Sequence, residues 1–252
     1  MVTAYDEPGA RYAGAAGVDM ILVGDSMANV VLGLDNTLGV TIADMCHHVR
    51  AVSNAKSNVH IVADMPWLSY HVEIGESVRN AGLLVRSGAD SVKLEGGRNR
   101  LGVIRALIDA EIPVMGHLGL TPQSVMSFGG FKVQAKSLEA AKQLTEDALL
   151  LQEAGVYACV IEGVPGIVGT RVTEALDMPT IGIGAGPETD GQVLVFHDLL
   201  GMTNRPPAKF VRQYADVGSV ITEALGRYAQ DVRNGSFPND SEAYANPEAL
   251  LD

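Results

Sequence analysis

The chain has 252 residues, 47% of them hydrophobic, which is enough for one large domain with a sizeable core. Its formal net charge of −12 at pH 7 disfavours contact with the phosphates of nucleic acids, so we expect no nucleic-acid partner. The sequence shows neither a signal peptide nor an apolar stretch of membrane-spanning length, which predicts a cytoplasmic protein without a membrane partner.

Short β-prone apolar runs recur along the chain, and most of them end beside a polar residue or a glycine. In chain order they are Val2–Tyr5, Met20–Val23, Val59–Ala63, Ser91–Gly96, Ile112–Gly116, Tyr157–Ile161, Pro179–Ile183 and Val193–Phe196. Near-continuous apolar strands of this kind are typical of a parallel sheet that is covered on both faces. The sequence therefore predicts eight parallel strands.

Helical patterns separate these runs. Apolar residues fall on one helical face within 78–85 and again within 101–108, and a third helix is predicted from Ser137, as its N-cap, to Ala154 before Gly155. Eight alternating units in this length predict an α/β fold, a (β/α)8 TIM barrel. We predict a single barrel domain over residues 1–252, with a C-terminal helical extension from about residue 205 that contains a helix around Val217–Val232.

Polar side chains follow the predicted strands. In a parallel barrel the carboxyl ends of the strands share one face, and such enzymes place their active sites there. The residues at these positions are Asp6, Asp25, Asp64, Glu95, His117 and Glu162. So many carboxylates cannot all stay ionised in one mouth without a counter-charge, so we expect a bound cation or raised pKa values.

Lys93 and Glu95 lie two residues apart on one predicted strand, so their side chains point to the same side. Val92 and Leu94 would then face the helices, which places Lys93 and Glu95 inside the barrel. A buried lysine needs a partner, and the acidic residues supply it. Carboxylate oxygens without a cysteine or histidine cluster favour Mg²⁺ as the cation.

Several of these residues also have simpler interpretations. An aspartate after a strand is most often a turn residue or a helix cap, and Asp6 is interpreted in that way. His117 is equally compatible with a hydrogen-bonded core histidine. The glycine-rich stretch 182–186 lacks the dinucleotide-binding spacing and is predicted to be a tight loop that could approach a ligand closely. His47 and His48 are expected on an exposed helix without a metal role.

Several motifs at the strand ends resemble the 3-methyl-2-oxobutanoate (ketopantoate) hydroxymethyltransferase family. They are Val23–Ser26, Ala63–Pro66, Val92–Gly97, Gly116–Ser124, Phe128–Gln134, Ile183–Gly186 and Thr189–Gln192. The resemblance runs from Thr3 to about Pro238, and the string Gly116–Ser124 is highly specific. It implies a (β/α)8 barrel of the phosphoenolpyruvate mutase/isocitrate lyase-like type.

The resemblance also implies a step in pantothenate (coenzyme A) biosynthesis. A hydroxymethyl group would pass from 5,10-methylenetetrahydrofolate to 3-methyl-2-oxobutanoate, which gives 2-dehydropantoate. By the same resemblance the enzyme is a homo-oligomer, a decamer, and Glu162 is its general base. The residues that would hold Mg²⁺ are Asp25, Asp64 and Glu95, and those that would contact the keto acid are Asp25, Ser26, Asp64 and Lys93.

The residue types fit this chemistry. Mg²⁺ chelated by the keto acid acidifies the adjacent carbon, and a carboxylate such as Glu162 can take the proton if its pKa is raised. Lys93 and Mg²⁺ could stabilise the enolate oxygen, and His117 could donate a hydrogen bond to it. The enolate would then attack the methylene carbon of the folate.

The sequence departs from the family pattern in three places. The family carries a further N-terminal segment with a helix before the first strand, and its loss would expose one barrel end or weaken subunit packing. Gly163 stands where a bulkier residue is common, which would loosen the neighbouring Glu162. The stretch Asp240–Tyr244 only loosely resembles the ending of the family.

Two other functions are weighed against the transferase. A carbon–carbon lyase or mutase of the same superfamily typically uses a cysteine-bearing loop. Cys46 lies in a predicted helix and Cys159 in a predicted strand, so both are expected to be reduced thiols without that role. A non-catalytic barrel would not need to keep costly interior charges such as Lys93 and Glu162.

Overall fold

A computed structural model describes residues 1–130, 132–203 and 205–244 of the chain. The chain divides into two compact units. The first contains residues 1–196 and 207–211, and the second contains residues 197–206 and the chain from residue 212 onward. None of the described helices is long and apolar enough to cross a membrane.

The first unit is built on one sheet of eight parallel strands that follow chain order. They are β1 (Val2–Thr3), β2 (Met20–Val23), β3 (His60–Asp64), β4 (Ser91–Glu95), β5 (Val114–Gly119), β6 (Ala158–Glu162), β7 (Thr180–Ile183) and β8 (Gly191–Gln192). A parallel bridge pairs Val2 with Leu194, and Thr3 N donates to Leu194 O at 3.1 Å. The first strand therefore meets the segment after the last one, and the predicted (β/α)8 barrel is confirmed.

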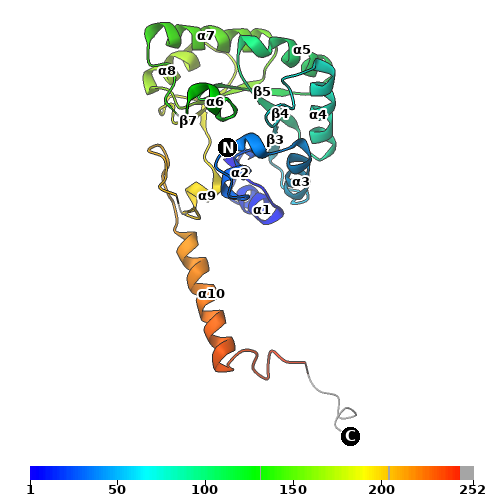
Figure 1. Cartoon of the computed structure of the whole chain (residues 1–252), viewed down its shortest axis with the longest axis vertical. Coiled ribbons are helices and arrows are strands. Elements are labelled where there is room, and N and C mark those ends of the chain that lie inside the picture. The colour runs from blue at the N-terminus through cyan, green and yellow to red at the C-terminus, as the bar shows by residue number, and fades with distance from the viewer. Residues whose placement is uncertain (131, 204, 245–252) are drawn as a thin grey trace. The chain divides into compact units, whose positions relative to one another are not determined.

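Helices surround the strands (Figure 1). The longer ones are α1 (Glu7–Ala15), α3 (Ile42–Ser53), α4 (Ile74–Arg86), α5 (Leu101–Asp109), α7 (Leu138–Glu153) and α8 (Gly166–Glu174). Shorter elements lie in the loops that follow the strands: α2 (Met27–Val30), η1 (Thr37–Gly39), η2 (Arg98–Arg100), η3 (Pro122–Ser124) and α6 (Val125–Phe128). The helices predicted within 78–85, 101–108 and 137–154 correspond to α4, α5 and α7.

Polar caps set where helices begin. The side chain of Asp6 accepts a hydrogen bond from Gly9 N at 2.8 Å, and Ser137 does the same for Ala140 N at 3.1 Å. These bonds satisfy first-turn N–H groups that have no partner within the helix. After α7, Gly155 adopts a φ of +94°, a conformation that favours glycine and ends the helix. The capping roles predicted for Asp6 and Ser137 are confirmed.

Alternation along the strands separates two apolar layers. One set of side chains forms the cluster inside the barrel: Leu22, Val62, Met115, Ala158, Val160, Ile181 and Val193. Their strand neighbours are also buried and point the other way, toward the helices; Val92 and Leu94 are fully buried in this layer. The interior is thus a packed core, and polar chemistry is confined to its ends.

The eighth strand differs from the expectation. It was expected at Val193–Phe196, but β8 covers Gly191–Gln192, and α9 (Phe196–Leu199) begins where the strand was expected to end. The apolar residues of this run serve other contacts, because Val193 belongs to the interior cluster and Leu194 pairs with Val2. The apolar residues that close the barrel therefore gave this run the sequence pattern of a full strand.

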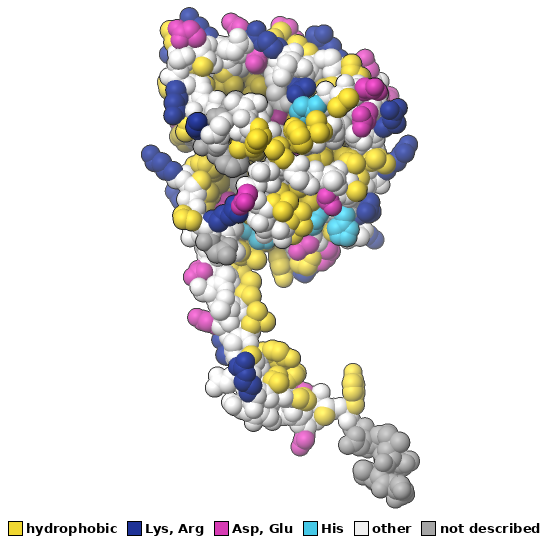
Figure 2. Space-filling model, viewed as in Figure 1, with side chains coloured by type: hydrophobic (Ala, Val, Ile, Leu, Met, Phe, Trp, Pro, Cys, Tyr) yellow, Lys and Arg dark blue, Asp and Glu magenta, His cyan; other side chains and the backbone are white. Residues whose placement is uncertain are grey.

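The second unit contains α10 (Val217–Asn234), close to the helix expected around Val217–Val232. Asp216 caps it through Ser219 N at 3.3 Å, and Gly235 follows it with a φ of +72°. No residue of α10 is buried. Figure 2 shows apolar side chains along this helix. Leu225 and Tyr228 of this helix are 63% and 56% exposed.

Candidate active site

Charged side chains from neighbouring strands gather at the carboxyl end of the barrel. Asp25 follows β2, Asp64 ends β3, Lys93 and Glu95 lie on β4, His117 lies on β5 and Glu162 ends β6. The first five are at most 5% exposed, and Glu162 is half-buried. Burial at this level makes each charge depend on its neighbours, because water cannot screen it.

Lys93 is at the centre of this group. Its Nζ lies 2.7 Å from Asp64 Oδ1, and Asp64 Oδ2 accepts a hydrogen bond from Asp25 N at 3.1 Å. Burial opposes the charged form of Lys93, but the carboxylates of Asp64, Glu95 and Asp25 outweigh it and raise the pKa of the amine. Lys93 therefore stays cationic inside the barrel, where alternation had placed it.

His117 bridges the lysine and the last acid of the group. Lys93 Nζ lies 3.2 Å from His117 Nδ1, and because an ammonium can only donate, Nδ1 accepts and the ring proton is on Nε2. That Nε2 contacts Glu162 Oε2 at 3.1 Å without hydrogen-bond geometry. Burial, with Lys93 adding to it, lowers the pKa of His117 well below its usual value, so the imidazole is neutral.

The pKa values of three of the acids, Asp25, Glu95 and Glu162, are raised. Burial, followed by the charge of Asp64, raises the pKa of Asp25 to about 7. Burial and Asp25 raise the pKa of Glu95 well above its usual value. Burial also raises the pKa of Glu162 to about 7, although Lys93 opposes the shift. One lysine thus does not compensate four acids, and the raised pKa values expected from the sequence are present.

Two residues that the sequence analysis did not single out tie the acids together. Gln123 N donates to Glu95 Oε2 at 3.0 Å, and Gln123 Nε2 donates to Asp25 Oδ2 at 2.8 Å. The hydroxyl of Tyr70 donates to Gln123 Oε1 at 2.6 Å, and both side chains are buried. Gln123 falls in the string Gly116–Ser124, but it lies in the loop after β5. Its role could not be predicted from the residues at the strand ends.

The carboxylates of this group differ in how many of their oxygens are already hydrogen-bonded or ion-paired, which decides which of them could bind a cation. Among the described residues, no three His, Cys, Asp or Glu side chains already converge as a metal site. Asp64 has both oxygens engaged, by Lys93 and by Asp25 N. Asp25 and Glu95 each give one oxygen to Gln123, and burial together with a neighbouring carboxylate raises the pKa of each, so further positive charge would be needed to keep both ionised. Carboxylate oxygens with excess charge fit a hard divalent cation.

The remaining polar residues that the sequence analysis named lie beside the charged group or outside it. Ser26 Oγ lies 2.9 Å from the Tyr5 hydroxyl, beside Asp25. Asp6 lies outside the group, as the cap of α1. His47 is exposed on α3, as expected, whereas His48 is half-buried and its Nδ1 donates to Tyr5 O at 2.7 Å.

The backbone around Glu162 is held on both sides despite Gly163. Leu120 N donates to Glu162 O at 2.8 Å, and Gly163 N donates to Ile183 O at 2.9 Å. Gly163 has a φ of +57°, and a Cβ there would press on Leu120. Gly163 is therefore suited to this position, because glycine adopts a positive φ without strain and has no Cβ to press on Leu120.

The glycine-rich loop after β7 packs against α8. Gly184 and Gly186 have φ values of +60° and +87°. A Cβ on Gly169 of α8 would overlap Ala185 O, and one on Gly186 would approach Gly166 Cα at 2.8 Å. These glycines therefore permit close contact between the loop and the helix.

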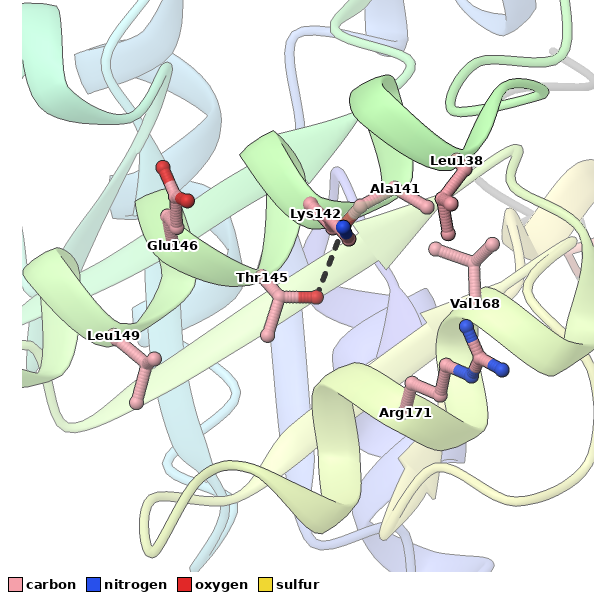
Figure 3. Close-up of a pocket in the computed structure, with 8 residues that line it drawn as sticks. All are labelled: Leu138, Ala141, Lys142, Thr145, Glu146, Leu149, Val168 and Arg171. Carbon is pink, nitrogen blue, oxygen red and sulfur yellow. Dashed lines mark hydrogen bonds between the residues drawn. The ribbon is translucent and has the colours of Figure 1, made fainter.

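A separate hollow lies between α7 and α8 (Figure 3). It has a volume of about 300 Å³ and is lined by Leu138, Ala141, Lys142, Thr145, Glu146, Leu149, Val168 and Arg171. None of these residues belongs to the charged group, and Thr145 Oγ1 donates to Ala141 O within α7. The hollow is therefore separate from the charged group at the carboxyl ends of the strands.

Sequence comparisons give a consistent result. The sequence profile of a family described as ketopantoate hydroxymethyltransferase matches residues 1–240. A 3-methyl-2-oxobutanoate hydroxymethyltransferase of Koribacter versatilis is 54% identical over 98% of this chain and 84% of the relative. One of Syntrophomonas wolfei is 54% identical over 100% of this chain and 92% of the relative.

Solved structures are similar in fold. A 2,3-dimethylmalate lyase, a member of the PEP mutase/isocitrate lyase superfamily, matches with a TM-score of 0.60 and 19% identity over 99% of this chain and 87% of that one. A phosphonopyruvate hydrolase in complex with oxalate and Mg²⁺ matches with a TM-score of 0.61 and 13% identity over 99% and 88%. At these identities the likeness concerns the fold alone, and it agrees with the barrel type expected from the sequence.

Proposed function

Because the chain belongs to the ketopantoate hydroxymethyltransferase family, we propose that it transfers a hydroxymethyl group from 5,10-methylenetetrahydrofolate to 3-methyl-2-oxobutanoate. The product is 2-dehydropantoate, an intermediate of pantothenate biosynthesis. The observation that carries the mechanism is Glu162, whose pKa of about 7 suits a base that takes a proton from carbon near neutral pH.

Asp25, Asp64 and Glu95 are the proposed metal ligands. A divalent cation held there, Mg²⁺ by its preference for oxygen, would supply Lewis acidity toward the keto and carboxylate oxygens of the substrate. Asp25 and Glu95 each retain an oxygen that Gln123 does not occupy. Asp64 would contribute through its ion pair with Lys93 or through water.

Proton removal from C3 of the keto acid is assigned to Glu162. The carboxylate takes the proton, and negative charge develops on the keto oxygen. Lys93, which stays cationic, stabilises that charge, and the Nε2–H of neutral His117 donates a hydrogen bond to the same oxygen. Ser26 and Asp25, adjacent on the loop after β2, are proposed to contact the rest of the keto acid.

The carbon nucleophile then attacks the methylene carbon of the folate. The methylene carbon is bonded to two nitrogens of the folate, and both of these bonds break: one as the new carbon–carbon bond forms, and the other as water supplies the hydroxyl oxygen to the same carbon. The proton held by Glu162 and the remaining proton of water go to the two nitrogens, and tetrahydrofolate leaves. The charged side chains are themselves buried, so bulk water screens them little, which strengthens each electrostatic contact.

A coupled assay tests this proposal. Purified protein is given 3-methyl-2-oxobutanoate and 5,10-methylenetetrahydrofolate, with Mg²⁺ or with a chelator, and 2-dehydropantoate is measured. We expect product only when Mg²⁺ and both substrates are present. Absence of product at saturating substrates and Mg²⁺ would favour the non-catalytic barrel.

The lyase alternative loses support from the cysteines. Burial raises the pKa of the Cys159 thiol to about 12, so it is not a thiolate at neutral pH, and it lies within β6. Cys46 is buried in α3. Neither thiol is placed on a loop near the charged group, where a cysteine-dependent lyase would need it.

The assembly is proposed to be a cytoplasmic homo-oligomer, with a decamer expected from the family resemblance. The apolar side chains along α10 support association, since exposed apolar surface of this kind favours burial against a partner. Light scattering after size-exclusion chromatography measures the mass directly, and a monomer at micromolar concentration would contradict the proposal.

A further inference from the structure

A directed chain of hydrogen bonds joins two of the proposed metal ligands. Glu95 N donates to the Tyr70 hydroxyl at 3.1 Å, and that hydroxyl donates to Gln123 Oε1 at 2.6 Å. Gln123 Nε2 donates to Asp25 Oδ2 at 2.8 Å, and Gln123 N donates to Glu95 Oε2 at 3.0 Å. The chain therefore begins at the backbone of Glu95 and ends on the carboxylates of Asp25 and Glu95.

The direction of this chain is fixed by groups that have only one role. The N–H of Glu95 can only donate, so the Tyr70 oxygen accepts from it and has its own proton for Gln123 Oε1. The carbonyl of Met65 can only accept, and Gln123 Nε2 donates to it at 3.0 Å. A flipped amide would place Oε1 against two acceptors, Met65 O and Asp25 Oδ2. Tyr70 and Met65 thus select one orientation of the Gln123 amide.

The backbone around Gln123 is also held in place. Gln123 lies in η3, whose first position is Pro122. Ser124 N donates to Thr121 O at 2.8 Å, and Thr121 Oγ1 donates to Ser124 Oγ at 3.0 Å. The backbone N–H of Gln123 and its side-chain Nε2 therefore donate from fixed positions, one to Glu95 and the other to Asp25. A site held in this way keeps its geometry without rearrangement when a ligand arrives.

We infer that Gln123, oriented by Tyr70, is a positioning residue that fixes the spacing of the Asp25 and Glu95 carboxylates. It engages one oxygen of each acid and leaves the second oxygen of each for the cation and the substrate. Asp25 follows β2 and Glu95 ends β4, so β3 separates their strands, and Gln123 is the described residue that bonds to both side chains. This inference rests on the proposed function, because the cation is part of that proposal.

Tyr70→Phe tests the inference without changing either carboxylate, although it also removes the acceptor of the Glu95 N–H, a loss that Gln123→Met does not share. The substitution keeps the ring, over which the Arg100 guanidinium lies at 5.5 Å, and removes only the hydroxyl that orients Gln123. Mn²⁺ binding is measured by electron paramagnetic resonance, without substrate or turnover. We expect the Kd for Mn²⁺ to rise about tenfold, because removing a group that orients metal ligands typically costs 10- to 100-fold in affinity.

Gln123→Met gives a second, more severe version of the same change, since it keeps length and volume but removes both the oxygen and the nitrogen of the side-chain amide. We expect a larger rise in the Mn²⁺ Kd than for Tyr70→Phe. Both variants should weaken metal binding more than they slow the reaction. The concentration of Mg²⁺ that gives half-maximal hydrogen exchange on the keto acid should therefore rise by a larger factor than the maximal rate falls.

Tyr157→Phe is the matched control. Tyr157 is half-buried, and its hydroxyl lies 2.8 Å from Ser91 Oγ at the amino ends of β4 and β6. It loses one hydroxyl as Tyr70→Phe does, so the two variants should shift the unfolding midpoint to a similar extent. Only Tyr70→Phe should weaken Mn²⁺ binding.

The outcomes separate the inference from the proposed function. Wild-type protein that binds no Mn²⁺ contradicts the metal site, and the inference with it. Wild-type binding that is unchanged in folded Tyr70→Phe and Gln123→Met contradicts the inference alone. An equal loss of affinity in Tyr70→Phe and Tyr157→Phe would also overturn it, because the effect would then come from general loosening of the barrel.

Discussion

Lys93 Nζ lies 2.7 Å from Asp64 Oδ1, and each of the two side chains is only 5% exposed. The pair joins β4 to β3 in the barrel interior. Its lysine supplies the positive charge that opposes the rise in the pKa of Asp25, Glu95 and Glu162. Removing either partner leaves a buried charge without compensation, which is more costly than the net contribution of the pair itself.

Lys93→Met should therefore lower the free energy of unfolding by about 3 kcal/mol or more, since breaking a buried pair typically costs 3–5 kcal/mol. Urea denaturation at pH 7 measures the change. The double variant Lys93→Met/Asp64→Asn should recover part of this loss, because it removes the orphaned carboxylate as well. A single variant as stable as wild type would show that the pair is not the main partner of either charge.

Glu162→Gln should abolish proton removal from the keto acid. We expect deuterium exchange at C3 of 3-methyl-2-oxobutanoate, measured by NMR without folate, to fall by roughly 10²- to 10⁴-fold, the usual contribution of a general base. Glu139→Gln, on the exposed first turn of α7, is the matched control. Exchange retained in Glu162→Gln would assign the base to another residue.

The pH dependence of exchange should follow Glu162. Its pKa is raised to about 7, and a base acts only when deprotonated. The exchange kcat/KM should therefore rise about tenfold per pH unit below that value and level off above it. A profile that is flat between pH 5 and pH 8 would be incompatible with this assignment.

The same shift predicts an effect on stability of definite sign. Folded Glu162, with a pKa of about 7, holds its proton up to about pH 7, whereas the unfolded chain releases it near 4.5, the usual pKa of a glutamate. Between these values the folded state binds more protons, so this group favours folding at low pH, and that contribution is lost as pH rises toward 7. Glu162→Gln should thus gain stability relative to wild type at pH 8 more than at pH 5, as measured by urea unfolding.

Gly169→Ala should destabilise the first unit, by about 1–3 kcal/mol as for other overpacked sites. The new Cβ would overlap the backbone oxygen of Ala185, which cannot move without shifting the loop after β7. Gly82→Ala in α4 is the control, because a Cβ there meets nothing within 4 Å and alanine is the better helix former. Thermal unfolding that shifted equally and in the same direction for both would contradict the packing argument.

Much of the fold and the charged group could be predicted from the sequence. Strand periodicity placed Lys93 and Glu95 in the interior, and the positions of Asp25, Asp64, His117 and Glu162 at strand ends brought them to one rim. These predictions succeeded because parallel strands point their carboxyl ends the same way. The position of a residue on its own strand was then sufficient.

The remaining features depend on contacts that no single segment reveals. Gln123 and Tyr70 reach the acids from loops after β5 and β3, and loop conformation is set by tertiary packing. The position of the eighth strand was predicted wrongly for the same reason. The apolar run that includes Val193 and Leu194 looks like a strand in sequence, but these residues are apolar because they contact other strands. Asp6 shows the converse, since a local capping rule was enough to set it apart from the other acids.

The bridge between Val2 and Leu194 gives the barrel a seam whose two sides are far apart in the sequence. Each βα unit can form from near neighbours, but this seam must close a loop of almost the entire first unit, at a high entropic cost. It should be the last junction to form during folding and the first to open afterwards. Amide hydrogens beside it, such as that of Thr3, should then exchange with solvent sooner than that of Val62 in the middle of the sheet.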